Sequence, residues 1–264
     1  MNIEINNLKY IYSSGVNALH DISLQIPTGS RIALIGQNGS GKTTLARHLN
    51  GLLKPTEGEV IIGDWPSSEH SVAQLASRVG YSFQNPDEQL CKRKVWDEIA
   101  FGAINLGYDS NKVKEQVQWA ISRMKLESYI DVNPHDLSMT NRRRVTIASV
   151  LAMDTPIIIL DEPTTGQDQR FLIQLASLLD ELQDLGKTVI TISHDMDFVA
   201  EQFDRILVLG HGEILLDGSI KSVFKEEEIL KSVHLQSPQI IRLARNLGYK
   251  GVVCSVNEFL DLRY

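Results

Sequence analysis

Apolar residues along the chain form two kinds of pattern. Short continuous apolar runs, which are typical of strands, stand at residues 3–5, 19–26, 31–35, 60–62, 157–160, 188–192 and 206–209. Helical spacing of apolar residues is clearest at residues 95–102, 113–126, 139–153 and 172–182. Strands that alternate with helices predict an α/β fold with a parallel sheet. The helical stretch at about 88–153 then predicts a helical insertion into that fold.

The two ends of the chain differ from this alternation. Turns such as the one at Pro27 and Gly29 separate the first apolar runs, and this pattern predicts a small antiparallel β subdomain. After about residue 224 we expect a charged helix, KEEEILKSV, and then a helix that Ser237 and Pro238 cap and start.

We therefore expect a main domain over residues 1–224 and a small C-terminal helical extension over residues 225–264. The extension either packs on the main domain or forms a dimer contact. The two alternatives stay open from the sequence.

Composition narrows the class of protein. The chain has 264 residues, of which 42% are hydrophobic and 22% charged, so a packed core is expected. A net charge of −7 argues against nucleic acid as the main partner. Cys91 and Cys254 lack metal or redox spacing, which suits a reducing cytosol. The sequence shows no pattern of a signal peptide, and no apolar run approaches the roughly 18 residues that cross a bilayer.

The most specific pattern is GQNGSGKT at residues 36–43, directly after the apolar run 31–35. A strand, a glycine-rich loop and a helix in this order cradle nucleotide phosphates. Three glycines can take backbone angles closed to other residues and let the loop N–H groups point inward: Gly36, Gly39 and Gly41. The helix expected at 43–53 directs its positive end to the same anion. Lys42 adds a charge near the terminal phosphates, and Thr43 supplies a hydroxyl for Mg²⁺.

Acidic and polar residues follow the later strands. The run IIILDE ends in Asp161, which can hold Mg²⁺ through water, and Glu162, which can take a proton from an attacking water. His194 follows the next strand, where we expect a functional role beside the phosphates. Gln84 ends another strand and carries a neutral oxygen suited to the Mg²⁺ shell.

Two aromatic residues precede the loop. Tyr12 lies 24 residues before Gly36, where its ring could stack on adenine. Tyr10 is the competing candidate.

This ordered set resembles the nucleotide-binding subunits of ABC transporters over about residues 1–222. The matching motifs are the aromatic residue Tyr12, the Walker A loop 36–43, Gln84 of the Q-loop, the Walker B run 157–162, the D-loop 165–168 and the switch residue His194. The resemblance implies a P-loop ABC-ATPase core with ATP and Mg²⁺ as cofactors. It implies ATP contacts at Tyr12, Gly36, Asn38, Gly39, Ser40, Gly41, Lys42, Thr43, Thr44, Gln84 and Ser138. It implies Mg²⁺ ligation by Thr43, Gln84 and Asp161, and catalysis by Glu162 and His194.

A narrower likeness lies in FQNPDEQL, in VWDEIAFGAINLG and in the tail PQIIRLARNLG. These segments are similar to the ATPases of energy-coupling-factor (ECF) transporters, which import vitamins and cobalt or nickel. The resemblance implies a peripheral protein on the cytoplasmic face of the cell membrane. It also implies three partners: a second ABC ATPase subunit, a transmembrane coupling subunit and a separate membrane protein that binds the solute. We expect the coupling subunit to dock near residues 85–95.

One motif departs from the family pattern. Where the family has LSGGQ, residues 137–141 read LSMTN. Met139 and Thr140 replace glycines whose bare N–H groups approach the γ-phosphate of the partner subunit. A homodimer would place this altered segment on both ATP molecules, so we expect a heterodimer with a subunit that carries LSGGQ. Two other functions stay open: a soluble ABC ATPase acting on DNA or ribosomes, and a regulatory subunit that binds ATP without turnover.

Overall fold

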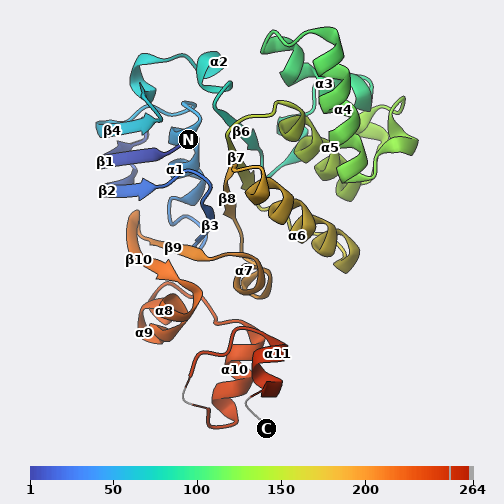
Figure 1. Ribbon diagram of the computed structural model, residues 1–264. Coiled ribbons are helices and arrows are strands. Elements are labelled where there is room, and N and C mark those ends of the chain that lie inside the picture. The colour runs from blue at the N-terminus through green and yellow to red at the C-terminus, as the bar shows by residue number, and fades with distance from the viewer. Residues whose placement is uncertain (250, 262–264) are drawn as a thin grey trace.

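A computed structural model describes residues 1–249 and 251–261 and contains two sheets (Figure 1). The strands are β1 Ile3–Ile11, β2 Asn17–Ile26, β3 Arg31–Ile35, β4 Glu57–Ile62, β5 Trp65–Pro66, β6 Val79–Ser82, β7 Ile157–Asp161, β8 Thr188–Ile192, β9 Arg205–Gly210 and β10 Glu213–Ser219. The smaller sheet has the order β2-β1-β4-β5, and all its pairs are antiparallel. The larger sheet has the order β10-β9-β3-β8-β7-β6 and is parallel except for the β9–β10 pair.

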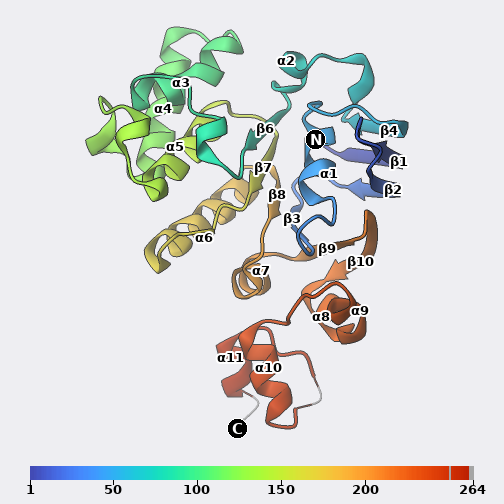
Figure 2. The same ribbon diagram turned by 180° about the vertical axis from the view of Figure 1, so that it is seen from behind.

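Helices connect and cover these strands. They are α1 Lys42–Leu49, α2 Val72–Leu75, α3 Val95–Asn105, α4 Ser110–Met124, α5 Met139–Ala152, α6 Gln169–Asp184, α7 Met196–Gln202, α8 Ile220–Lys225, α9 Glu227–Ser232, α10 Gln239–Asn246 and α11 Val256–Asp261. Short 3₁₀ turns stand at 67–69, 86–88, 127–129 and 134–136. Helices α3, α4 and α5 form a separate group beside the larger sheet (Figures 1 and 2).

The five parallel strands of the larger sheet are largely apolar because both faces of that part of the sheet are buried, whereas the edge strand β10 is partly exposed. In β7, Ile157 and Ile159 pack toward the smaller sheet and α1, whereas Ile158 and Leu160 pack toward the covering helices. Ile157–Asp161 is buried at every position. This two-sided burial fixes the positions of the carboxyl ends of the parallel strands relative to one another. The polar residues that follow these strands therefore lie at one edge of the sheet.

Two local expectations were wrong, and a third holds with a shifted start. Helix α1 ends at Leu49 rather than near residue 53, because Gly51 takes a positive φ of 75° and turns the chain. The expected charged helix is present as α9, but it starts at Glu227 because Lys225 ends α8 and Glu226 leaves helical geometry between the two helices. Ser237 does not cap α10, because Pro238 occupies the cap position; the Ser237 hydroxyl accepts instead from Arg245 Nη1 at 3.2 Å.

The last two helices lie at the end of the molecule away from the smaller sheet (Figure 1). They enclose a small apolar cluster of Ala244, Val253 and Phe259, while Ile241 packs into the main core. No helix in the described part of the chain is long and apolar enough to cross a bilayer.

Candidate functional site

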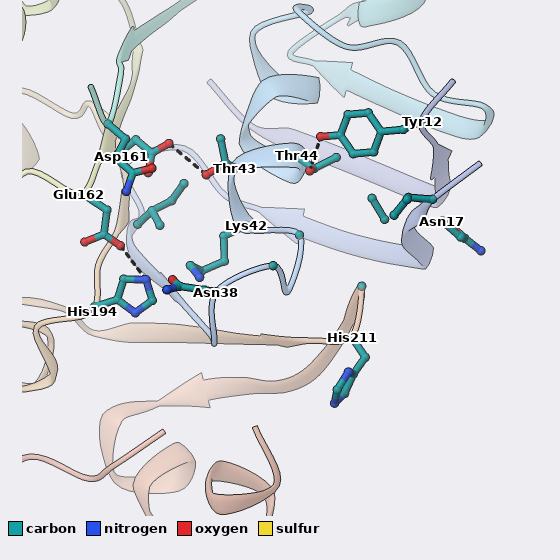
Figure 3. Close-up of a pocket in the computed structure, with 17 residues that line it drawn as sticks. Tyr12, Asn17, Asn38, Lys42, Thr43, Thr44, Asp161, Glu162, His194 and His211 are labelled. Carbon is teal, nitrogen blue, oxygen red and sulfur yellow. Dashed lines mark hydrogen bonds and ion pairs between the residues drawn. The ribbon is translucent and has the colours of Figure 1, made fainter. Parts of the chain in front are cut away.

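A cleft of about 600 Å³ opens where β3, β7 and β8 end (Figure 3). Predicted site residues from five separate segments line it: Tyr12, Asn38, Gly39, Gly41, Lys42, Thr43, Thr44, Gln84, Asp161, Glu162 and His194. The fold therefore brings most of the predicted residues to one place. Gly36 and Ser40 belong to the same loop, and the Ser40 side chain is buried.

The loop before α1 needs glycine at positions of close approach. A Cβ at Gly36 would lie 2.1 Å from the carbonyl oxygen of Leu209, so no other side chain fits. Gly41 takes a φ of 106° at the N-cap of α1, and a Cβ there would lie 2.8 Å from the Ala18 carbonyl oxygen. Backbone N–H groups can consequently line the concave side of the loop, at the positive end of α1.

Lys42 is buried, and its ammonium group closes the loop. Nζ donates to the carbonyl oxygens of Gly36 at 2.7 Å and Gln37 at 2.9 Å. Burial lowers the pKa of Lys42, and the charges of Glu162 and Asp161 oppose that shift. A cation held in this position is suited to bind an anion that enters the loop.

Asp161 is fixed through one of its two carboxylate oxygens. Oδ2 accepts from the Tyr81 hydroxyl at 2.7 Å and from Thr43 Oγ1 at 3.3 Å. Oδ1 is buried, and among the described residues it has no hydrogen-bond partner. Burial raises the pKa of Asp161, and the two hydroxyl donors oppose the shift. A buried, unpartnered carboxylate oxygen next to a threonine hydroxyl fits Mg²⁺ and its waters.

Glu162 and His194 lie next to each other at one side of the cleft (Figure 3). His194 Nε2 lies 3.2 Å from Glu162 Oε1, and Glu162 Oε2 accepts from Thr165 Oγ1 at 3.2 Å. Burial raises the pKa of Glu162 to about 7 and lowers the pKa of His194. A carboxylate whose pKa is near neutrality can both accept and release a proton at physiological pH, which suits proton transfer from water.

The two aromatic alternatives pack edge to face on each other, with ring centroids 4.8 Å apart, but only one of them lines the cleft. Tyr12 lines the cleft, and its hydroxyl lies 2.8 Å from Thr44 Oγ1. Tyr10 instead packs edge to face on His48, with ring centroids 4.7 Å apart. Tyr12 is thus the ring available at the mouth of the cleft, together with the exposed side chains of Asn17 and His211.

The altered signature segment lies outside the cleft. Ser138 is the N-cap of α5, and its hydroxyl accepts from the Asn141 N–H at 3.3 Å. The Met139 side chain is 53% exposed. Thr140 Oγ1 lies 3.5 Å from the Gly166 carbonyl oxygen, so this segment borders the D-loop. Ser138 is the one predicted ATP contact in the described chain that stands apart from the others.

Two buried residues at the site escaped the sequence analysis. Tyr81 reads as an ordinary apolar position of β6, although its hydroxyl binds Asp161. Arg143 belongs to the basic run 142–144, to which no role at the site was assigned, yet it is 5% exposed and donates to the backbone of Glu162 and Gln84. Two sequence signals could have revealed these residues. One is a tyrosine hydroxyl within an apolar strand, and the other is a basic residue on the buried side of α5.

The family and the relatives that match this chain all belong to the ABC transporter ATP-binding proteins. The ABC transporter family matches residues 19–165. An ABC transporter ATP-binding protein of Pyrococcus furiosus is 41% identical and covers 98% of both chains. The energy-coupling factor transporter ATP-binding protein EcfA of Methanoculleus marisnigri is 39% identical over 95% of this chain and 91% of its own. Some other matched relatives are longer, and this chain spans 43% of their length.

Solved structures share the fold. The structure of cbiO1 from Clostridium perfringens, described as part of the ABC transporter complex cbiONQ, superposes with a TM-score of 0.76. It is 36% identical and covers 92% of this chain and 98% of its own. The predicted α/β fold with a P-loop ABC-ATPase core is confirmed by this match.

Proposed function

Because the chain belongs to the ABC transporter family of ATP-binding proteins and is an ABC ATPase, we propose that it energises an ECF-type importer for a vitamin or a transition metal ion. The observation that carries this proposal is a cleft that unites the phosphate loop, Asp161, Glu162 and His194. Similarity to EcfA and cbiO1 supports the ECF subtype.

ATP enters with its phosphates in the loop and its adenine toward Tyr12. The loop N–H groups and Lys42 bind the β- and γ-phosphates, with Lys42 exchanging its carbonyl partners for phosphate oxygens. Asn38, Ser40 and Thr44 complete the cradle. Thr43, Asp161 and Gln84 are the residues that hold Mg²⁺, which when bound neutralises charge on the phosphate oxygens.

Hydrolysis then needs a water aligned with the γ-phosphate. The oxygen of that water forms a bond to the γ-phosphorus while Glu162 accepts one of the water's protons. At the same time the bond between the γ-phosphorus and the β–γ bridging oxygen breaks, and ADP leaves. His194, 3.2 Å from the carboxylate, orients this group and senses the γ-phosphate. Both residues stand at the ends of neighbouring strands, so their distance is set by the sheet.

The altered signature determines which partner is needed. Each ATP in a head-to-tail dimer lies between the Walker residues of one subunit and the signature of the other. The side chains of Met139 and Thr140 obstruct the approach that glycine permits, so this chain completes its partner's site poorly. A partner with LSGGQ completes the site built on Lys42 and Glu162. A heterodimer with one competent site follows from this.

The membrane coupling subunit docks beside the Q-loop. An apolar groove of about 340 Å³ runs between α3, α5 and β6 and includes Phe101, Leu106 and Met153. Tyr81 forms part of the groove wall, and its hydroxyl donates to Asp161 in the nucleotide cleft. A segment of the coupling subunit in the groove therefore contacts a residue that is hydrogen-bonded to the cleft. Asp87 and Glu88, on the expected docking segment, have partners inside the chain: Arg142 at 2.9 Å and Arg47 at 4.0 Å. The groove is thus a better docking surface than these two acids.

Docking is tested by placing a charge in the groove. Phe101→Asp should reduce recovery of membrane subunits with this chain, because a charge buried against an apolar partner is costly. Leu185→Asp, at an exposed position after α6, is the matched control. Equal recovery with both variants would contradict docking at this groove.

The proposed function is tested by purifying the tagged chain from its native membrane. Mass spectrometry should identify a second ABC ATPase, a coupling subunit and a solute-binding membrane protein. Reconstituted vesicles should accumulate a vitamin, cobalt or nickel only with ATP and with Glu162 intact. Recovery with ribosomes or DNA and without membrane proteins would support the soluble alternative and contradict an importer.

A regulatory role without turnover is the second candidate, and the LSMTN sequence favours it. Full retention of complex turnover in a Glu162→Gln variant would support this alternative.

A further inference from the structure

Arg143 is a buried cation at the meeting point of three motifs. It lies in the first half of α5, the helix that begins directly after Ser138, and only 5% of the residue is exposed. Among the described residues, its guanidinium donates hydrogen bonds to backbone carbonyl oxygens rather than to a carboxylate. Nη1 donates to the Glu162 carbonyl oxygen at 2.7 Å, and Nη2 donates to the Gln84 carbonyl oxygen at 2.8 Å.

Burying a guanidinium is costly, so its position needs a reason. Within residues 1–249 and 251–261, its Nε has no hydrogen-bond partner. Lysine could not span both carbonyl oxygens in the same way, because a planar fork presents two donors at fixed spacing and an ammonium group does not. Arg143 is therefore suited to hold two backbone carbonyl groups at a fixed distance from each other.

One of those backbone groups is strained. Glu162 has a φ of 53°, the left-handed region that residues with a Cβ avoid. Such a conformation persists only where the surroundings fix it on both sides. The Glu162 N–H donates to the Ile192 carbonyl oxygen at 2.9 Å, and its own carbonyl oxygen accepts from Arg143. A longer contact of 3.3 Å comes from the Thr165 N–H.

The other backbone group belongs to the Q-loop. Gln84 lies just after β6, which pairs in parallel with β7, the strand that ends beside Glu162. One side chain from α5 thus ties the ends of two neighbouring strands. A displacement of α5 relative to the sheet would act on both peptides at once.

We propose that Arg143 is a positioning residue that holds the strained Glu162 peptide in its reactive conformation and links it to the Q-loop and to α5. This inference rests on the proposed role of Glu162 in taking the proton from water. Through Arg143, the placement of the helix that carries the signature segment sets the placement of the Glu162 carboxylate. Helix α5 therefore affects this chain's own cleft through Arg143, in addition to the effect of the signature segment on the partner's ATP.

The first test compares Arg143→Met and Arg143→Lys in the assembled membrane complex. Removing the fork should lower kcat by about 10- to 100-fold, because misplacing a reacting group by roughly 1 Å has effects of that size. ATP affinity, measured by equilibrium binding, should stay near that of the unmodified complex. Arg143→Lys should also be impaired, because it keeps the charge and loses the fork, and it tests the proposal if Arg143→Met does not fold.

Arg78→Met is the matched control. Arg78 also links two segments through a backbone carbonyl, that of Ile62 at 2.7 Å, and pairs with Asp64, but it lies in the region of the smaller sheet. Its loss should lower the unfolding temperature while kcat stays near the unmodified value. Unmodified kcat in Arg143→Lys would overturn the proposal. The proposal would also be overturned if Arg78→Met, at equal loss of stability, lowered kcat by as much as Arg143→Met.

The second test combines Arg143→Met with Glu162→Gln. Residues that act as a unit are strongly non-additive, so Arg143→Met should reduce the residual kcat of Glu162→Gln little or not at all. A reduction by the same factor as in the unmodified complex would overturn the link while leaving the role of Glu162 intact. Normal turnover by Glu162→Gln alone would remove the proposed role of Glu162, and the positioning role of Arg143 with it.

Discussion

The nucleotide cleft and the signature segment contrast within one chain. Lys42, Asp161 and Glu162 are buried, and each side chain has a hydrogen-bond partner within this chain. In the signature segment, Ser138 and Met139 are exposed, and the two glycines of the family pattern are absent. The first region contains every residue of the proposed half-site that this chain supplies, and under the proposed heterodimer the second region faces the ATP of the partner subunit. Under that proposal, this chain is suited to receive a signature segment from its partner rather than to supply one.

The largest expected effect is on the proposed half-site. Glu162→Gln should lower ATP turnover of the complex by about 10²–10⁴-fold, because a general base contributes on that scale. ATP binding should persist, because the phosphate loop and Lys42 are untouched. Turnover and equilibrium ATP binding are measured on the same preparation. Unchanged turnover would show that the proton acceptor has been misassigned.

A second prediction concerns Lys42. Lys42→Ala should weaken ATP binding by roughly 10- to 150-fold, since a hydrogen bond to a charged group is worth about 1.5–3 kcal/mol. Titration with ATP in the absence of Mg²⁺ isolates this contribution. ATP affinity equal to that of the unmodified chain would contradict the assignment of Lys42 to the phosphates.

A third prediction concerns the Mg²⁺ ligand. Tyr81→Phe removes one oxygen and with it the bond to Asp161 Oδ2, so the carboxylate loses one of its two positioning donors. We expect the Mg²⁺ concentration for half-maximal turnover to rise about three- to tenfold, which corresponds to roughly one lost hydrogen bond. Mn²⁺ binding followed by electron paramagnetic resonance provides a readout independent of turnover.

Tyr108→Phe is the control for that change, because its hydroxyl also donates a partly buried hydrogen bond, to the Met153 carbonyl oxygen at 2.9 Å. The control should leave the Mg²⁺ requirement unchanged. An equal rise in both variants would mean that Tyr81 acts only through general stability.

The smallest expected effect is on the signature segment. Changing Met139 and Thr140 together to glycine should raise total turnover, roughly doubling it if the restored second site equals the first. The measurement is ATP turnover by the complex at saturating ATP. A decrease with normal folding would show that these side chains serve the partner's site rather than obstruct it.

Much of the site could be predicted because its residues follow strands in a fixed order. The phosphate loop follows β3, Asp161 and Glu162 end β7, and His194 follows β8, so parallel pairing brings them to one edge. Tyr81 and Arg143 could not be assigned in the same way. Their roles depend on which side chain turns inward and meets a group far along the chain, and local pattern does not contain that information. The failed Ser237 cap has a local cause instead, because a shift of one residue places Pro238 at the cap position.

Under the proposed heterodimer the two ATP sites are unequal, and one paired experiment measures that asymmetry. ATP turnover is measured for the purified complex with Lys42→Ala in this chain, and separately with the matching lysine changed in the partner ATPase. We expect the change in this chain to abolish most turnover and the change in the partner to have the smaller effect. Equal loss from both changes, or vigorous turnover by this chain alone, would contradict the proposed asymmetry.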